Sequence, residues 1–114
     1  MAELHVRQLL IAALLCATVS LAAGPAEAPF AAESGAAMHK MMAAMSITPS
    51  GDVDADFVAM MVPHHQGAIE MAQAELRHGR NEPLRRIAQE IIVTQLQEIA
   101  AMRLALGQTA GDPK

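Results

Sequence analysis

The sequence contains no tryptophan or tyrosine and only two phenylalanines among its 114 residues. It therefore offers no aromatic platform on which nucleobases could stack. Basic runs are also absent: the formal net charge is −4, and the arginines between residues 77 and 86 are interspersed with glutamates. Neutralising phosphates requires clustered lysine or arginine. Both absences argue against a nucleic-acid partner.

Cysteine occurs once, at Cys16, inside the uncharged apolar run Leu9–Ala23. Such a run, after a short polar start and ending in the small-x-small triplet Ser20–Ala22, is typical of a secretory signal peptide. The run is shorter than the roughly 20 residues of a membrane span. We predict a signal peptide over residues 1–22 and a periplasmic or secreted protein without disulfides or a stable membrane anchor. An uncleaved anchor is the alternative.

Catalytic motifs are missing as well. The sequence shows no nucleophile–base arrangement and no glycine-rich phosphate loop, so we do not expect an enzyme. No β-strand pattern and no internal repeat are present. Aspartates 52, 54 and 56 have the spacing of a calcium loop, but such a loop needs glycine at its sixth position and glutamate at its twelfth, where this chain has Phe57 and Pro63.

The apolar periodicity predicts three helices. The first covers residues 33–46 and ends at the turn residues 48–51, and the second begins at the acidic residues after Gly51 and runs to about His78 through Pro63, which should kink it. The third covers residues 82–106 and is capped by Asn81. Residues 23–32 are predicted to be a flexible leader, residues 33–107 the helical domain and residues 108–114 a disordered tail.

Three helices joined by short turns predict a small all-α bundle of the ferritin-like or four-helix type. The second helix has an apolar arc wide enough to contact two neighbours, so we expect it to be central. Its solvent side should carry Gln66, Glu70, Gln73 and Arg77. A fourth helix would have to come from the leader or from a second copy of the chain, and on this ground we expect a homodimer.

Methionine is abundant where aromatic residues are scarce: nine are present, eight of them after the predicted signal peptide. Within Met60–Ala72 (MMVPHHQGAIEMA), two methionines each precede a histidine by four residues, which places a thioether and an imidazole on the same helical face. The pairs are Met60 with His64 and Met61 with His65, and Met71 returns to the His64 face. The two histidines should point about 100° apart.

Further candidate ligands lie on the other two helices. A stripe of methionines without leucine or isoleucine marks the first helix, and a histidine lies beside it: Met38, His39, Met41, Met42 and Met45. The third helix contributes Met102, and its Gln95 and Glu98 lie close to the apolar stripe, where they could support a ligating histidine through its second nitrogen. Methionines at such positions can equally be core residues, and the histidines can be buried groups that Gln95 or Glu98 satisfies. Glu98 can also simply reach solvent at the edge of the stripe.

Thioether and imidazole ligands together favour copper. Soft sulfur selects Cu(I), and imidazole accepts both Cu(I) and Cu(II). Zinc would call for thiolates, carboxylates or three histidines, and calcium or magnesium for oxygen ligands. By the same softness Ag(I) should bind. We therefore predict a copper-binding protein that sequesters or delivers the ion, with other periplasmic copper-handling proteins as partners.

Two alternatives stay open. Glu75 and His78 form a Glu-x-x-His, the pattern that supplies ligands in di-iron bundles, but such a site needs two of these motifs and two further glutamates. A metal-independent interaction or chaperone-like protein of the periplasm would instead use an exposed apolar groove.

The segment from Asp54 to Ala72, with the later spacing of Ile91, Gln95, Glu98, Ile99 and Met102, resembles a family of exported Met/His-rich proteins classed as a domain of unknown function, which includes the periplasmic copper-binding protein CopM. The resemblance covers residues 38–106. It implies a ferritin-like bundle, export, and copper binding through Met60, Met61, His64, His65 and Met71.

Overall fold

The computed structural model describes residues 24–109, which form three helices without a β-strand. These are α2 (Glu27–Met45), α3 (Val53–His78) and α4 (Glu82–Ala105). The predicted all-α bundle is confirmed. The predicted signal peptide lies outside the described residues. None of the helices described between residues 24 and 109 has the length and hydropathy of a membrane span.

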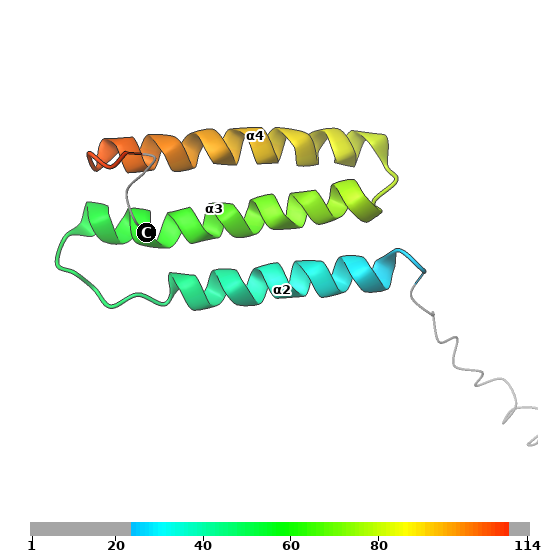
Figure 1. Cartoon of the computed structure of the whole chain (residues 1–114), viewed down its shortest axis with the longest axis horizontal. Helices are drawn as coiled ribbons and strands as arrows, with labels where there is room; N and C mark the ends of the chain where they lie inside the picture. Colours follow the sequence, from blue (N-terminus) through cyan, green and yellow to red (C-terminus); the bar gives the residue numbers. More distant parts are fainter. Residues whose placement is uncertain (1–23, 110–114) are drawn as a thin grey trace, which may run out of the picture.

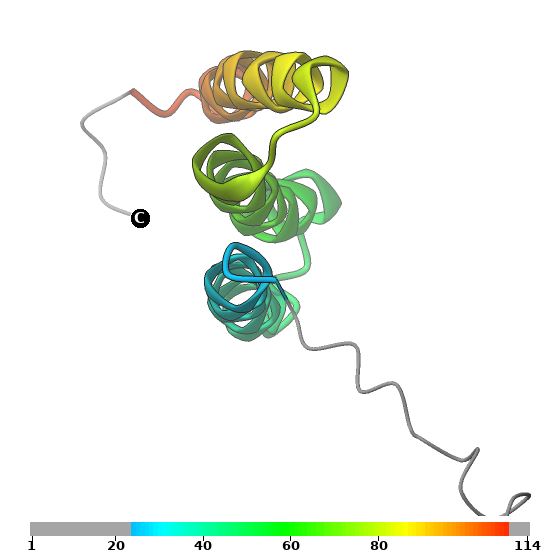
Figure 2. The same cartoon turned by 90° about the vertical axis from the view of Figure 1, so that its right-hand side faces the viewer.

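The three helices lie side by side in one layer, with α3 in the middle (Figures 1 and 2). Helix α3 packs against both neighbours, whereas the backbones of α2 and α4 do not approach each other. The predicted central position of this helix is therefore confirmed. Successive helices run antiparallel because the turns that join them are short (Figure 1).

The helix boundaries follow local capping chemistry. The Asp52 side chain accepts hydrogen bonds from the backbone N–H groups of Asp54 and Ala55 at the start of α3, and Asn81 accepts one from Leu84 at the start of α4. Helix α3 continues without a break through Pro63. Gly107 has a φ of 72°. This conformation lets the backbone N–H of Gln108 donate a hydrogen bond to the Arg103 carbonyl, which closes the end of α4.

Two sequence-based boundaries need correction. Helix α2 begins at Glu27, six residues before the predicted start at Glu33, so most of the segment predicted as a flexible leader is helical. Pro29 is tolerated there because N–H groups in the first turn of a helix have no intrahelical partner. Gln108 belongs to the cap of α4 rather than to a disordered tail. Residues 110–114 of that predicted tail lie outside the described residues.

The core is thin and built mainly from small side chains. Its buried apolar residues include four alanines, and no large side chain is fully enclosed; the set is Ala37, Val58, Ile69, Ala72, Ala74, Ala88 and Ile99. A single layer has two faces and cannot cover both. Leu84 and Ile87, which the sequence places in the apolar stripe of the third helix, therefore remain 52% and 50% exposed.

The two faces of the layer differ in chemistry. One face, called here the polar face, carries the ion pair between Lys40 and Glu70 and the pair between Arg77 and Glu33. Gln66, Glu70, Gln73 and Arg77 line shallow hollows on this side, as predicted for the solvent side of α3. The opposite face, called here the open face, contains an apolar groove between Phe30 of α2, Met71 of α3 and Ile87 of α4.

Candidate metal-binding site

His65 is the buried histidine of the adjacent pair. It lies on the side of α3 that packs against α4 and is 9% exposed. Its Nε2 lies 2.8 Å from Oε2 of Glu98, a half-exposed residue of α4. The sequence offered Gln95 and Glu98 as candidate partners of the two histidines, and the structure pairs Glu98 with His65 while leaving the Glu98 side chain half-exposed.

The pairing with Glu98 determines what the other ring nitrogen can do. An ionised carboxylate only accepts hydrogen bonds, so the Nε2 of His65 carries the hydrogen and donates it. In the neutral ring, Nδ1 then presents a lone pair. This Nδ1 is buried and has no hydrogen-bond partner, and the side-chain oxygen of Gln95 is likewise buried without a partner. Native proteins rarely leave such groups unsatisfied unless an ion, a water molecule or a function accounts for them.

Methionines flank His65 on both helices. Met61 lies one turn before His65 on α3, and Met102 lies one turn after Glu98 on α4; both are half-buried. Because α3 and α4 are antiparallel and His65 contacts Glu98, one helical turn back on α3 corresponds to one turn forward on α4. Met61 and Met102 therefore stand at the same level of the layer. We refer to Met61, His65, Glu98 and Met102 as the α3–α4 cluster.

His64 is exposed and lies toward the open face, together with the half-buried Met60 one turn earlier. The sequence predicts that the two histidines point toward different neighbours, and their burial agrees with this. Their ring centroids are nevertheless only 5.9 Å apart, with the rings inclined by 61°. The two Met–His pairs are thus adjacent, and His64 stands at the edge of the α3–α4 cluster.

The methionines of α2 separate into contacting and exposed residues. Met41 packs against Gly67: a Cβ atom added to that glycine would lie 2.7 Å from the Met41 sulfur. Met45 is half-buried, whereas Met38 and Met42 are exposed. His39 is exposed and lies about 200° around the helix from the buried Ala37, so it points away from α3.

Met71 is also separated from the histidines. It lines the apolar groove together with Ala68 and Ile91. Seven residues separate it from His64, which corresponds to about 10 Å along a helix. Helical periodicity predicts that both residues share one face of α3, two turns apart. Of the predicted ligands, Met61, His65 and Met102 are thus the ones that the register of the His65–Glu98 contact places at neighbouring turns of α3 and α4.

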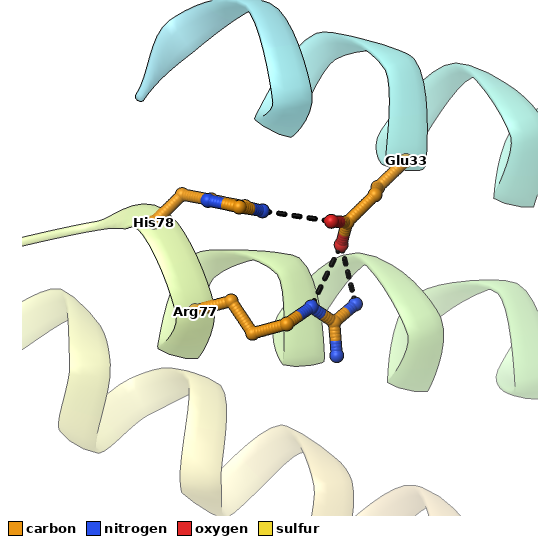
Figure 3. Close-up of polar contacts among 3 residues, drawn as sticks. All are labelled: Glu33, Arg77 and His78. Atoms are coloured by element: carbon orange, nitrogen blue, oxygen red, sulfur yellow. Dashed lines mark hydrogen bonds and ion pairs between the residues drawn. The ribbon is translucent and has the colours of Figure 1, made fainter. Parts of the chain in front are cut away.

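A polar cluster at the other end of the α2–α3 contact was not predicted. The Glu33 carboxylate of α2 accepts hydrogen bonds from Nε of Arg77 and Nε2 of His78, each with a donor–acceptor distance of 2.8 Å (Figure 3). These bonds, first that from His78 and then that from Arg77, hold the pKa of the Glu33 carboxyl below its usual range. No periodic pattern indicates this cluster, because Glu33 lies more than 40 residues from its partners.

His78 is therefore occupied by Glu33, and the Glu75 carboxylate lies over Gly79 at the end of α3. Within residues 24–109, no three side chains of histidine, cysteine, aspartate or glutamate come together in a group that could hold a metal ion. Met61 and Met102 are the residues that would add sulfur ligands to a metal site at His65. Sulfur ligands of this kind favour Cu(I) and Ag(I).

The model of one protein family matches residues 16–106 of the chain. No curated protein matches the sequence. Since the match covers most of the chain, the protein belongs to the family described as domain of unknown function DUF305.

Proposed function

We propose that this protein is an exported copper-binding protein that holds Cu(I), with Cu(II) as a second oxidation state, for sequestration or for delivery to other copper-handling proteins. The observation that carries this proposal is the state of His65. Its Nε2 is held by Glu98, and its buried Nδ1 has no hydrogen-bond partner. Half-buried methionines lie one turn away on each helix, Met61 from His65 and Met102 from Glu98. A carboxylate that orients a histidine through one nitrogen is the usual support for a metal ligand at the other.

The composition of the cluster determines the type of metal. Thioethers stay neutral and need not lose a proton to bind, so the α3–α4 cluster would attract a soft monovalent cation. The shape of the site favours exchange over catalysis: it lies in a thin layer, with Glu98 half-exposed and His64 exposed beside it. His64 and Met60 are positioned to receive or release the ion at the open face.

The test is a competition for Cu(I) between the protein and a colorimetric chelator. Replacing both cluster methionines by leucine conserves volume and removes the sulfur atoms. We expect Met61→Leu with Met102→Leu to lower the affinity at least tenfold, and Glu98→Gln to lower it by about 10- to 100-fold, the usual effect of losing such a supporting group. Met71→Leu and His39→Ala are the matched controls and should compete like the wild type.

Equal competition by the wild type, the double methionine variant and a His65→Gln variant would show that these residues are structural, and the proposal would fail. Circular dichroism of each variant establishes whether it is still folded. Loss of binding in the Met71→Leu control, with the cluster variants unaffected, would move the site to the groove.

A second candidate function is a metal-independent interaction or chaperone-like role. The apolar groove of the open face favours it, since only one of its nine lining residues, Glu75, is charged. This alternative predicts that copper leaves the thermal stability unchanged.

A further inference from the structure

The open face combines a hollow and a projecting side chain. The groove encloses about 370 Å³ at one end of the layer, and the α3 residues that line it are Ala68, Met71, Ala72 and Glu75. Phe57, which is 53% exposed, lies nearer the other end of α3. It precedes Glu75 by 18 residues, or about five whole turns, so both residues lie on the same side of the helix. An aromatic projection and an apolar hollow thus share one face.

We propose that the open face is the interface of a homodimer in which Phe57 of each chain fills the groove of the other. Two-fold contacts join the same surface on both copies, so each needs both a projection and a complementary hollow. The open face supplies both. This inference does not depend on copper binding.

The arrangement fixes the relative direction of the two chains. If Phe57 enters a groove centred between Ala68 and Glu75, the two-fold axis crosses α3 about halfway, near His64. The α3 helices of the two copies are then antiparallel, and His64 lies close to the partner's His64. The alternative is a parallel arrangement, which would place Phe57 against the partner's Phe57 and leave both grooves empty.

The size of the face is sufficient for a stable dimer. Three helices spaced by about 8–10 Å over roughly 30 Å of shared length present about 750 Å². A standard interface buries about 800 Å² per partner. Apolar side chains that a folded monomer leaves exposed, including Leu84 and Ile87, would become buried. The polar face, with the Lys40–Glu70 and Arg77–Glu33 pairs, would incur a desolvation cost on burial and is a poorer docking surface.

The first test is the mass of the full chain in solution, measured by sedimentation. The wild type should be a dimer, and Phe57→Glu should be a monomer because it would bury a charge in the groove. Val93→Glu is the matched control: Val93 is 56% exposed and lies about 180° around α4 from Leu84, away from the open face. This variant should remain a dimer.

A monomeric wild type, a dimeric Phe57→Glu variant or a monomeric Val93→Glu variant would each overturn the proposal. The last result would place the contact on the exposed stripe of Val93, Leu96 and Leu104 on α4 instead. Phe57→Glu leaves the α3–α4 cluster intact, so copper competition by the same variant tests the proposed function separately.

The second test uses single cysteines in the full chain, with Cys16, its only cysteine, replaced by serine. Under mild oxidation, His64→Cys should form a disulfide between the copies, and His39→Cys, on the side of α2 away from α3, should not. Phe57→Cys should also remain uncrosslinked. Efficient crosslinking at Phe57, or none at His64, would overturn the antiparallel arrangement.

Discussion

Gly67 shows how one residue determines the spacing of two helices. Besides the Met41 sulfur, a Cβ atom at this position would meet Cβ of Met41 at 3.0 Å and Cγ at 3.1 Å. A sulfur atom at the end of a flexible side chain can move aside, but Cβ is fixed to the backbone. The close approach of α2 and α3 therefore depends on the absence of a side chain at Gly67.

Replacing Gly67 by alanine should consequently destabilise the fold, although alanine is the better helix former. Overpacking a well-filled contact costs about 1–3 kcal/mol, which exceeds the roughly 1 kcal/mol gained in helix propensity. Gly35, within α2, has nothing within 4 Å of its added Cβ, so Gly35→Ala should stabilise the chain by about 0.5–1 kcal/mol. Urea unfolding of both variants measures the difference. A stabilised Gly67→Ala would show that α2 and α3 can separate without cost.

The histidines show the limit of sequence reasoning at this scale. Helical periodicity separated the directions of His64 and His65 and offered Gln95 and Glu98 as candidate partners. It could not decide which histidine would be buried, because that depends on where α4 packs. Nor could it show that the Nδ1 of His65 lacks a partner, which requires the positions of all neighbouring polar atoms.

At the scale of the helices, capping chemistry was readable because it is local. Acidic residues before an apolar run indicated the start of α3, and Asp52 is indeed its cap. The start of α2 was misplaced because two prolines suggested an extended leader, whereas Pro29 occupies the first helical turn, where proline is compatible with a helix. The contacts between helices, such as that of Glu33 with His78, join distant residues and leave no periodic signal.

The cap of α3 can be tested by removing its side chain. Asp52 Oδ1 accepts from the N–H groups of Asp54 and Ala55 at 3.0 and 3.2 Å. Asp52→Ala should therefore lower the free energy of unfolding by about 1 kcal/mol. Asp54→Ala, which removes a neighbouring acid without a capping bond, should cost less than half of that. Equal losses would mean that general electrostatics, rather than the cap, stabilises the start of α3.

The Glu33 cluster predicts a pH dependence for the α2–α3 contact. Because His78 and Arg77 lower the pKa of Glu33 in the folded state, ionised Glu33 stabilises the fold above its unfolded pKa. That contribution is lost as the pH falls through the lowered folded pKa, below the ordinary range of a glutamate carboxyl. Glu33→Gln should thus melt at a lower temperature than the wild type at neutral pH, and the two melting temperatures should converge in acid.

Glu70→Gln is the control for this comparison, because Glu70 pairs with Lys40 across the same two helices but has no histidine partner. At neutral pH, the melting temperature of Glu70→Gln should differ less from that of the wild type than the melting temperature of Glu33→Gln does. A Glu33→Gln variant that melts like the wild type at neutral pH would show that the cluster contributes nothing to the contact.

At the scale of the whole molecule, the class of fold followed from the sequence but its shape did not. Apolar stripes on three helices predicted a bundle with a central second helix, and both features are present. The same stripes implied that Leu84 and Ile87 would be core residues, whereas a layer of three helices leaves one side of each helix uncovered. Periodicity shows which apolar residues share one face of a helix, but not whether another helix of the same chain covers that face.

The proposed copper site predicts a gain in stability for the whole molecule. A ligand that binds only the folded state at about 100 times its Kd adds about 2.7 kcal/mol to the free energy of unfolding. For a domain of this size each kcal/mol raises the melting temperature by about 4–8 °C, so Cu(I) should raise it by about 10–20 °C. The measurement is thermal unfolding under reducing, oxygen-free conditions at one fixed protein concentration, since a dimer also melts in a concentration-dependent way.

The variant Met61→Leu with Met102→Leu should lose most of the gain, and Met71→Leu should keep it. Identical melting curves with and without Cu(I) in the wild type would contradict copper binding and favour the interaction role of the open face.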